Sequence, residues 1–352
     1  MGKKIIYGIQ QVGVGVEDVH QAWTWYRKHF GMDIKAFEEA AMAELMLPYT
    51  EGKPRPRHAV LAFNLQSGGG FEVWQHTGKK PLKPQFEPQL GDLGIFIAKQ
   101  KTKNVQKAFD FLKSQGVDVL GEIVKAPNQQ AHFFVRDPFG NIFQVIENDY
   151  IFTKTPAFTG GVLGAIIGVS DIDKSLKLYR DILGYSEIIY DETDVFKDFV
   201  AIPGGSLNAR RILLRPQKRA TGGFSPLFGP TEIELIQVND SPVRHIYENR
   251  MWGDPGFIHL CFDIHNMNQL REDCLEKGFP FTVDSNNSFD MGEAAGHFAY
   301  VSDPDGTPIE FVETHKLPLI KAIGWEINLT TRDPEKPLPN WIIKALRMKR
   351  EK

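Results

Sequence analysis

The chain of 352 residues contains two copies of one pattern, and this duplication constrains the fold more than any other feature. The segment 14–32 (VGVEDVHQAWTWYRKHFGM) aligns without a gap with the segment 167–185 (IGVSDIDKSLKLYRDILGY). In each copy an apolar strand leads to Asp, which favours the start of a helix, and Gly follows where the helix would end. A chain with this pattern is expected to fold as two related halves.

A second pair of segments extends the repeat and divides each half. The segments 136–149 (RDPFGNIFQVIEND) and 302–315 (SDPDGTPIEFVETH) both place an Asp-Pro-x-Gly turn between two strands. The segments 93–119 and 258–283 each predict a strand, a helix and another strand. The sequence therefore predicts four units, each with one strand, one helix and about three further strands: unit A (7–77), unit B (92–149), unit C (161–240) and unit D (256–315).

Composition excludes several classes of partner. The chain is 42% hydrophobic and 24% charged, and its net charge of −3 provides no cationic surface for nucleic acid or an anionic membrane. We find no apolar run of membrane-spanning length and no signal peptide at the N-terminus. The two cysteines do not indicate a disulfide framework, and Cys261 is predicted to be a buried thiol. We therefore expect a cytoplasmic monomer or homodimer that acts on a small molecule.

The four units resemble the vicinal oxygen chelate superfamily, which includes glyoxalases, extradiol dioxygenases, epimerases and antibiotic resistance proteins. The resemblance covers residues 7–315 and is carried by the Tyr-Arg-x-x-x-Gly motif at 26–31 and by Asp-Pro-Asp-Gly before the strand IEFVE. It implies an α+β fold in which tandem βαβββ units form two half-open mixed β-barrels. The expected domains are 1–152 (units A and B), 153–318 (units C and D) and a C-terminal tail at 319–352 with a short helix.

The resemblance also implies where metal ligands would lie. In this superfamily each unit contributes one position at the head of its first strand and one in the middle of its last strand. Carried over unit by unit, these positions are Gln11 and Glu72 in A, Gly94 and Gln144 in B, Gly164 and Glu234 in C, and His259 and Glu310 in D. Pairing A with D assembles Gln11, Glu72, His259 and Glu310, the set that glyoxalase I uses, whereas pairing B with C retains Glu234 as the one strong ligand.

A metal-dependent lyase or isomerase of the glyoxalase I type follows from that set. The resemblance implies one divalent metal (zinc, nickel, cobalt, manganese or ferrous iron), with Glu310 or Glu72 transferring a proton between adjacent carbons of a small carbonyl or thioester-type substrate. The positions that bind glutathione in glyoxalase I are Gly15, His76 and Pro255 here. We therefore expect a different substrate, or glutathione held in a different way.

Two alternative functions are compatible with the sequence. Pairing A with B and C with D would place Glu234, His259 and Glu310 around Fe(II), as an extradiol or hydroxyphenylpyruvate-type dioxygenase would need. A non-enzymatic protein of the resistance type would use a barrel cavity to bind a small molecule. The remaining histidines that we considered show no ligand spacing along the chain: His20, His29, His58, His265 and His315.

Overall fold

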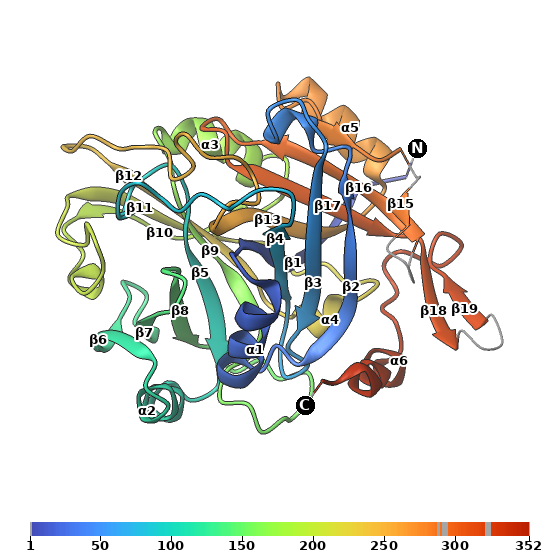
Figure 1. Cartoon of the computed structure of the whole chain (residues 1–352), viewed down its shortest axis with the longest axis horizontal. Helices are drawn as coiled ribbons and strands as arrows, with labels where there is room; N and C mark the ends of the chain where they lie inside the picture. The colour runs from blue at the N-terminus through green and yellow to red at the C-terminus, as the bar shows by residue number, and fades with distance from the viewer. Residues whose placement is uncertain (1, 287–288, 291–294, 321–324, 352) are drawn as a thin grey trace.

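The computed structural model describes residues 2–286, 289–290, 295–320 and 325–351, and most of its strands form two large curled sheets (Figure 1). We name them the AD sheet and the BC sheet after the units that build them. The AD sheet has nine strands in the order β14-β16-β17-β13-β1-β4-β3-β2, with β15 paired to β16. Its strands are β1 (Ile5–Gly15), β2 (Ile34–Ala43), β3 (Arg55–Phe63), β4 (Gly70–His76), β13 (Gly256–His265), β14 (Val283–Asp284), β15 (Phe289–Asp290), β16 (Ala295–Ser302) and β17 (Pro308–Thr314).

The BC sheet repeats this arrangement with eight strands in the order β10-β11-β12-β9-β5-β8-β7-β6. Its strands are β5 (Gly94–Thr102), β6 (Asp118–Lys125), β7 (Ala131–Arg136), β8 (Ile142–Glu147), β9 (Val162–Gly168), β10 (Glu187–Asp194), β11 (Ala209–Arg215) and β12 (Glu232–Val238). Both sheets mix parallel and antiparallel pairs. The two mixed half-barrels predicted from the sequence are therefore confirmed.

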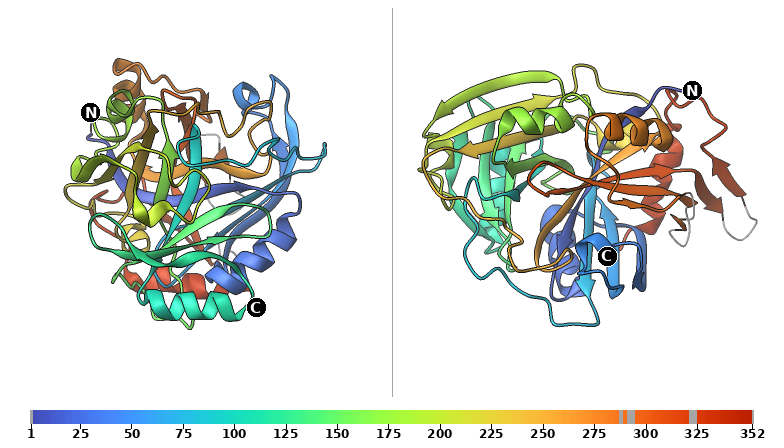
Figure 2. Two further views of the ribbon diagram at one scale, coloured as in Figure 1. Left: turned by 90° about the vertical axis from the view of Figure 1, so that its left-hand side faces the viewer. Right: turned by 90° about the horizontal axis from the view of Figure 1, so that it is seen from above.

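The first strands of the units decide which units share a sheet. β1 of unit A pairs antiparallel with β13 of unit D, and β5 of unit B pairs antiparallel with β9 of unit C. Figure 2 shows the consequence, with the blue and red strands grouped on one side and the green and yellow strands on the other. Each sequence half contributes one unit to each sheet. The domain boundaries at 152 and 318 remain a prediction.

One helix follows the first strand of each unit. These helices are α1 (Val19–Phe30), α2 (Val105–Ser114), α3 (Ile172–Tyr179) and α5 (Met267–Glu276). The carboxylate of Asp18 caps α1 by accepting bonds from the backbone N–H groups of His20 and Gln21, and Gly31 ends it at φ 62°. Asp171 likewise caps α3 by accepting a bond from the backbone N–H of Lys174, but the C-cap of α3 is Arg180, four residues before the glycine expected to end it. None of the described helices is both long and apolar enough to span a membrane.

Shorter elements complete the described part of the chain. The short helical segments are α4 (Ser225–Phe228), α6 (Asn340–Lys344), η1 (Leu47–Tyr49), η2 (Lys197–Phe199) and η4 (Ala345–Lys349). The strands β18 (Lys316–Ile320) and β19 (Trp325–Asn328) form a separate hairpin, drawn in red in Figure 1. The helix α6 is the short helix expected in the C-terminal tail, and its Ile342 and Ile343 are buried.

The two repeated sequence motifs meet across the interface between the sheets. The hydroxyl of Tyr26 donates to Asp137 at 2.6 Å, and that of Tyr179 donates to Asp303 at 2.9 Å, both in buried positions. Each bond therefore joins the Tyr-Arg motif of one unit to the Asp-Pro turn of the next, linking A to B and C to D. Because one partner belongs to the AD sheet and the other to the BC sheet, the motifs tie the two half-barrels together.

Candidate metal centre

Strand register brings the four predicted ligands to one face of the AD sheet. Gly13 of β1 is the partner of Glu72 on β4 and of His259 on β13. One row further along, Gln11 is the partner of Cys261, and Cys261 is the partner of Glu310 on β17. Because alternate residues of a strand share a face, the two rows present their side chains on the same side of the sheet.

The four side chains surround one point. The imidazole Nε2 of His259 lies 3.3 Å from Glu72 Oε2 and 3.2 Å from Glu310 Oε2. The amide Nε2 of Gln11 lies 3.3 Å from the same oxygen of each carboxylate. His259 is fully buried, and the carboxylates of Glu72 and Glu310 retain 13% and 10% exposure. The structure thus brings Gln11, Glu72, His259 and Glu310 together at a site that solvent can still reach.

These donors fit a divalent cation. Two potential ligand atoms, Gln11 Oε1 and His259 Nε2, are buried and have no hydrogen-bond partner among the residues that the structure describes. Ligand atoms of Glu72, His259 and Glu310 all lie within 4.8 Å of one another. Carboxylate, amide and imidazole groups are ordinary ligands of divalent metals, and buried polar atoms without partners are costly. A cation bound between the carboxylates would satisfy His259 Nε2, and it would also satisfy Gln11 Oε1 once the amide, whose Nε2 faces the carboxylates here, turns over.

Burial and mutual repulsion set the electrostatics of the centre. Burial raises the pKa of Glu310 above its usual value, and the nearby Glu72 adds to this, while His259 acts in the opposite direction. Burial alone would lower the pKa of His259, but the carboxylates of Glu310 and Glu72 outweigh it and leave that pKa raised. The site therefore has an excess of negative charge that a cation would compensate.

Two aromatic residues position the imidazole. The hydroxyl of Tyr300 lies 3.3 Å from Nδ1 of His259 and also interacts with the carboxylate of Glu310, its partner across β16 and β17. The ring of Trp252 is stacked on the imidazole, with centroids 6.1 Å apart and planes inclined by 20°. Trp252 also contacts Trp74 at 4.6 Å between centroids. The centre therefore lies beside a wall of aromatic rings.

Sequence reasoning did not identify three neighbours of the centre. Gly13 and Cys261 follow Gln11 and His259 by two residues, so the alternation of side chains along a strand could have indicated them. The thiol of Cys261 interacts with Glu310, and burial raises its pKa well above the usual range. Trp252 lies in the irregular segment between β12 and β13, which carries no periodic signal.

That segment also contacts two of the three positions that depart from the glutathione-binding pattern, and it contains the third. A Cβ atom on Gly15 would lie 2.1 Å from the carbonyl oxygen of Asp254, so a larger residue does not fit there. The ring Nε2 of His76 lies 3.0 Å from the carbonyl oxygen of Trp252. Pro255, the third position, belongs to the segment itself. Residues 252–255 therefore pack against both Gly15 and His76.

The BC sheet carries no equivalent set among its described residues. Glu234 of β12 has Ile166 as its partner on β9, and Ile166 in turn pairs with Ile97 on β5. Ile97, rather than Gly94, therefore stands in the position of His259. The expectation for Gly94 was wrong because the two strands were aligned three residues out of register: Gly94 pairs with Gly168 as Gly256 pairs with Gly15, which makes Gly94 the counterpart of Gly256 and Ile97 that of His259.

A buried ammonium group pairs with Glu234 in the BC sheet. Lys99 Nζ lies 2.6 Å from Glu234 Oε2 and 2.5 Å from Glu232 Oε1, and all three side chains are at most 1% exposed. The hydroxyl of Tyr190 donates to Glu234 at 2.8 Å, and the guanidinium of Arg211 binds the same carboxylate. Arg211 and Lys99 overcome the effect of burial and hold the pKa of Glu234 well below its usual range.

This arrangement does not assemble the ligand set of the dioxygenase alternative. Glu234 lies on the BC sheet within an ion-pair network, whereas His259 and Glu310 lie on the AD sheet. The three residues would share a site only if unit C paired with unit D. The observed pairing of β9 with β5 excludes that arrangement in this structure.

The fold and the centre define a class: two mixed half-barrels built from βαβββ units, with carboxylate, amide and imidazole groups on the inner face of one. The family described as the Glyoxalase/Bleomycin resistance protein/Dioxygenase superfamily matches the chain at residues 8–145 and again at 165–301. The chain belongs to this superfamily. The first match covers nearly all of unit A and most of unit B, and the second covers most of units C and D.

Individual relatives are more distant. A lactoylglutathione lyase of Schizosaccharomyces pombe is 27% identical over 181 residues, which are 48% of this chain and 54% of that protein. The match thus spans about half the length of that curated relative. Glyoxalase I from Zea mays has a TM-score of 0.53 at 13% identity, with 99% of this chain and 96% of that chain covered. A putative dioxygenase from Bacillus subtilis has a TM-score of 0.57 at 11% identity, covering 88% and 86%. These structural similarities establish the fold alone.

Proposed function

We propose that this protein is a metal-dependent lyase or isomerase of the glyoxalase type, which transfers a proton between adjacent carbons of a small carbonyl or thioester-type substrate. One observation carries the proposal. Carboxylates from β4 and β17 both lie within 3.3 Å of the imidazole of His259, in a site where Gln11 completes the donor set. The match to a lactoylglutathione lyase supports the same type of chemistry.

Gln11, Glu72, His259 and Glu310 would hold one divalent metal. When bound, such a metal supplies a Lewis acid that stabilises negative charge on a substrate oxygen. Zinc, nickel, cobalt, manganese and ferrous iron all accept these donors. The set contains one histidine and two carboxylates, which differs from the two histidines and one carboxylate of iron oxygenases. The donor set therefore favours proton transfer over oxygen chemistry.

The chain itself would move the proton. A carboxylate oxygen of Glu310 or Glu72 would take the proton from the carbon next to the carbonyl and return it to the neighbouring carbon. Only protons move: the carbon-bound proton passes to the neighbouring carbon and the hydroxyl proton passes to the former carbonyl oxygen, so no oxidant or reductant is needed. Tyr300 would keep His259 in the tautomer with the proton on Nδ1, because its hydroxyl oxygen can accept that proton in a hydrogen bond. This leaves the Nε2 lone pair of His259 directed at the carboxylates.

The surroundings of the centre support an apolar group on the substrate. Trp74, Trp252 and Tyr300 form the wall beside His259, and aromatic rings of this kind bind apolar or planar groups. Residues 252–255 pack against Gly15 and His76, two of the positions that correspond to the glutathione-binding residues of glyoxalase I. We therefore infer a substrate whose recognition depends on the aromatic wall.

Proton exchange with solvent tests the proposal without knowledge of the physiological substrate. The purified protein would be incubated in D₂O with a panel of 2-hydroxyaldehydes, 2-hydroxyketones and hemithioacetals of 2-oxoaldehydes, and NMR would follow both product formation and deuterium at the carbon next to the carbonyl. We expect turnover or exchange that is lost on chelation and restored by one of the five metals. Absence of exchange in a metal-loaded protein would contradict the proposal.

Each alternative function has its own signature in the same experiment. A dioxygenase would consume O₂ in the presence of ferrous iron and a phenolic or 2-oxo acid substrate. A binding protein would carry no metal after purification and would show saturable binding without turnover. Measurement of the metal content and of O₂ uptake therefore distinguishes all three functions.

A further inference from the structure

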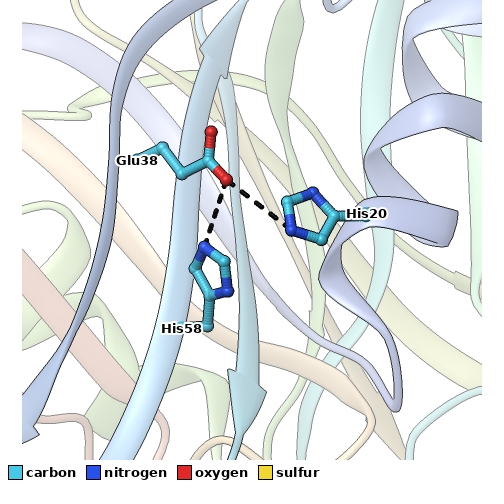
Figure 3. Close-up of side chains that lie close together, drawn as sticks. All are labelled: His20, Glu38 and His58. Carbon is cyan, nitrogen blue, oxygen red and sulfur yellow. Dashed lines mark hydrogen bonds and ion pairs between the residues drawn. The ribbon is translucent and has the colours of Figure 1, made fainter.

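We propose a second metal site on the surface of this protein, formed by His20, Glu38 and His58 and separate from the proposed catalytic centre. Figure 3 shows both imidazole rings directed at one carboxylate oxygen. The three residues are distant in the sequence, and the sequence predicted no ligand role for either histidine. Spacing along the chain does not indicate this cluster, because only tertiary structure brings these side chains together.

Three elements present the ligands. His20 lies in the first turn of α1, Glu38 lies on β2, and His58 lies on the neighbouring strand β3. In the β2–β3 pair Glu38 faces Val60, which is two residues from His58, so the carboxylate and the imidazole share one face of the sheet. The helix α1 packs against this face, and its N-terminal end brings His20 above them.

The distances are close to those that a metal requires. Glu38 Oε1 lies 3.2 Å from His58 Nε2 and 3.7 Å from His20 Nε2, and the two rings meet edge to face at 5.0 Å. One ligand atom from each residue lies within 4.8 Å of the others. Tetrahedral zinc holds its ligand atoms roughly 3.4 Å apart. The side chains therefore need to close by about 1 Å, and the 60% exposure of His20 leaves its side chain free to move.

Lys35 orients the carboxylate without occupying the site. Its ammonium lies 3.0 Å from Glu38 Oε2, whereas both histidines face Oε1. The same ammonium lies 3.0 Å from a carboxylate oxygen of Glu351, which offsets its positive charge. Outer partners of this kind fix the direction of a ligating group and increase metal affinity. Oε1 is thus left for a cation that both imidazoles can reach.

The ligand chemistry selects the class of metal. Two imidazoles and one carboxylate suit Zn²⁺, Ni²⁺ or Cu²⁺, whereas Mg²⁺ and Ca²⁺ prefer sites made of oxygen alone. Three protein ligands leave further coordination positions for water. The site lies on the opposite face of the sheet from the proposed catalytic centre, because His58 is three residues from Leu61, the partner of Glu72. A metal here would join α1 to β2 and β3 rather than take part in turnover.

Counting bound metal tests this proposal. Untagged protein would be stripped with a chelator and dialysed against Zn²⁺ at pH 7.5, and the bound zinc per chain would be measured by elemental analysis. We expect the double variant His20→Ala/His58→Ala to bind one equivalent fewer than the wild type. The variant His245→Ala removes an exposed histidine outside the cluster and should bind as much as the wild type. Equal stoichiometry and affinity in the double variant and the wild type would overturn the proposal.

Thermal unfolding separates this site from the catalytic centre. In a His259→Ala background, Zn²⁺ should still raise the unfolding temperature, because a ligand that binds only the folded state stabilises it. Adding His20→Ala/His58→Ala to that background should abolish the rise. A rise that persists in the triple variant would show that zinc binds elsewhere. Failure of the catalytic proposal would leave both results unchanged, so the two proposals are tested independently.

Discussion

Gly13 and His259 are backbone partners across β1 and β13, and a Cβ atom on Gly13 would lie 2.5 Å from Cε1 of His259. Such a contact is far inside the ordinary separation of carbon atoms. The absence of a side chain at Gly13 therefore creates the space that the imidazole occupies. The corresponding residue of unit C is Ile166, which faces Ile97 where no histidine is present.

Gly13→Ala should disable the centre while retaining all four proposed ligands. The added methyl group would displace the imidazole, and a shift of about 1 Å at a reacting site reduces activity roughly 100-fold. Metal affinity would be measured by equilibrium dialysis and turnover by the exchange assay, with chemical unfolding as a check of the fold. Unchanged metal affinity in a folded variant would contradict the proposed role of this glycine.

His259→Ala and Gln144→Leu form a matched pair of changes in the two sheets. Loss of His259 should reduce bound metal and activity more than about tenfold, because a ligand is removed outright. Gln144 stands where the BC sheet would place the counterpart of Glu310, and within the described part of the chain both of its polar side-chain atoms lack hydrogen-bond partners. Gln144→Leu should therefore keep metal and activity. A loss of metal in the Gln144 variant would argue for a site on the BC sheet.

Tyr300→Phe tests the positioning of the imidazole. The change removes the hydroxyl that lies 3.3 Å from Nδ1 of His259 and leaves the ring in place. Loss of such an outer partner typically costs 10- to 100-fold in metal affinity or activity. We expect the dissociation constant for the metal to rise by about that factor while the unfolding temperature changes little. A variant with a lowered unfolding temperature and unchanged metal affinity would assign Tyr300 a purely structural role.

Lys99→Met should destabilise the fold without affecting the AD centre. The change leaves the buried carboxylates of Glu232 and Glu234 without the ammonium they share, and breaking a buried ion pair on one side costs about 3–5 kcal/mol. Lys107→Met, at an exposed position of α2, is the control and should change stability by less than about 0.5 kcal/mol. Equilibrium unfolding in urea would measure both. Equal stability of the two variants would show that the network contributes little.

The burial of Lys101 leads us to predict that the stability of the folded protein depends on pH. It is fully buried, its Nζ donates to the carbonyl oxygens of Val162 and Phe228 at 2.9 and 2.6 Å, and burial lowers its pKa to about 7. The unfolded chain has a lysine pKa near 10.4, so between pH 7 and 10 the unfolded state binds more protons and stability rises with pH.

Lys101→Met removes that contribution. The free energy of unfolding of the wild type minus that of the variant should therefore increase with pH, by up to about 1.4 kcal/mol for each pH unit between pH 7 and 10. Urea unfolding of both proteins at pH 7.0 and 9.0 measures the difference. A difference that is constant across this range would show that the buried amine keeps its ordinary pKa.

The sequence alone determined the local elements and the candidate residues. The Asp and Gly caps, the Asp-Pro turns and the alternation of apolar residues all depend on neighbours within a few positions, and the predicted units correspond to βαβββ segments in the structure. The resemblance to the superfamily, carried over unit by unit, identified Gln11, Glu72, His259 and Glu310, which the structure brings together. Their role as metal ligands stays a prediction.

Tertiary structure decided how these pieces combine. Which first strands pair, and with which register, depends on contacts between segments more than 200 residues apart, such as β1 with β13. This pairing places Glu234 and His259 on different sheets and puts Ile97, rather than Gly94, opposite Ile166. The fold also packs the ring of Trp252 on the imidazole of His259. It also gathered His20, Glu38 and His58 at one surface point. Local propensity encodes the elements, but only the packing of distant strands and loops determines which side chains share a site.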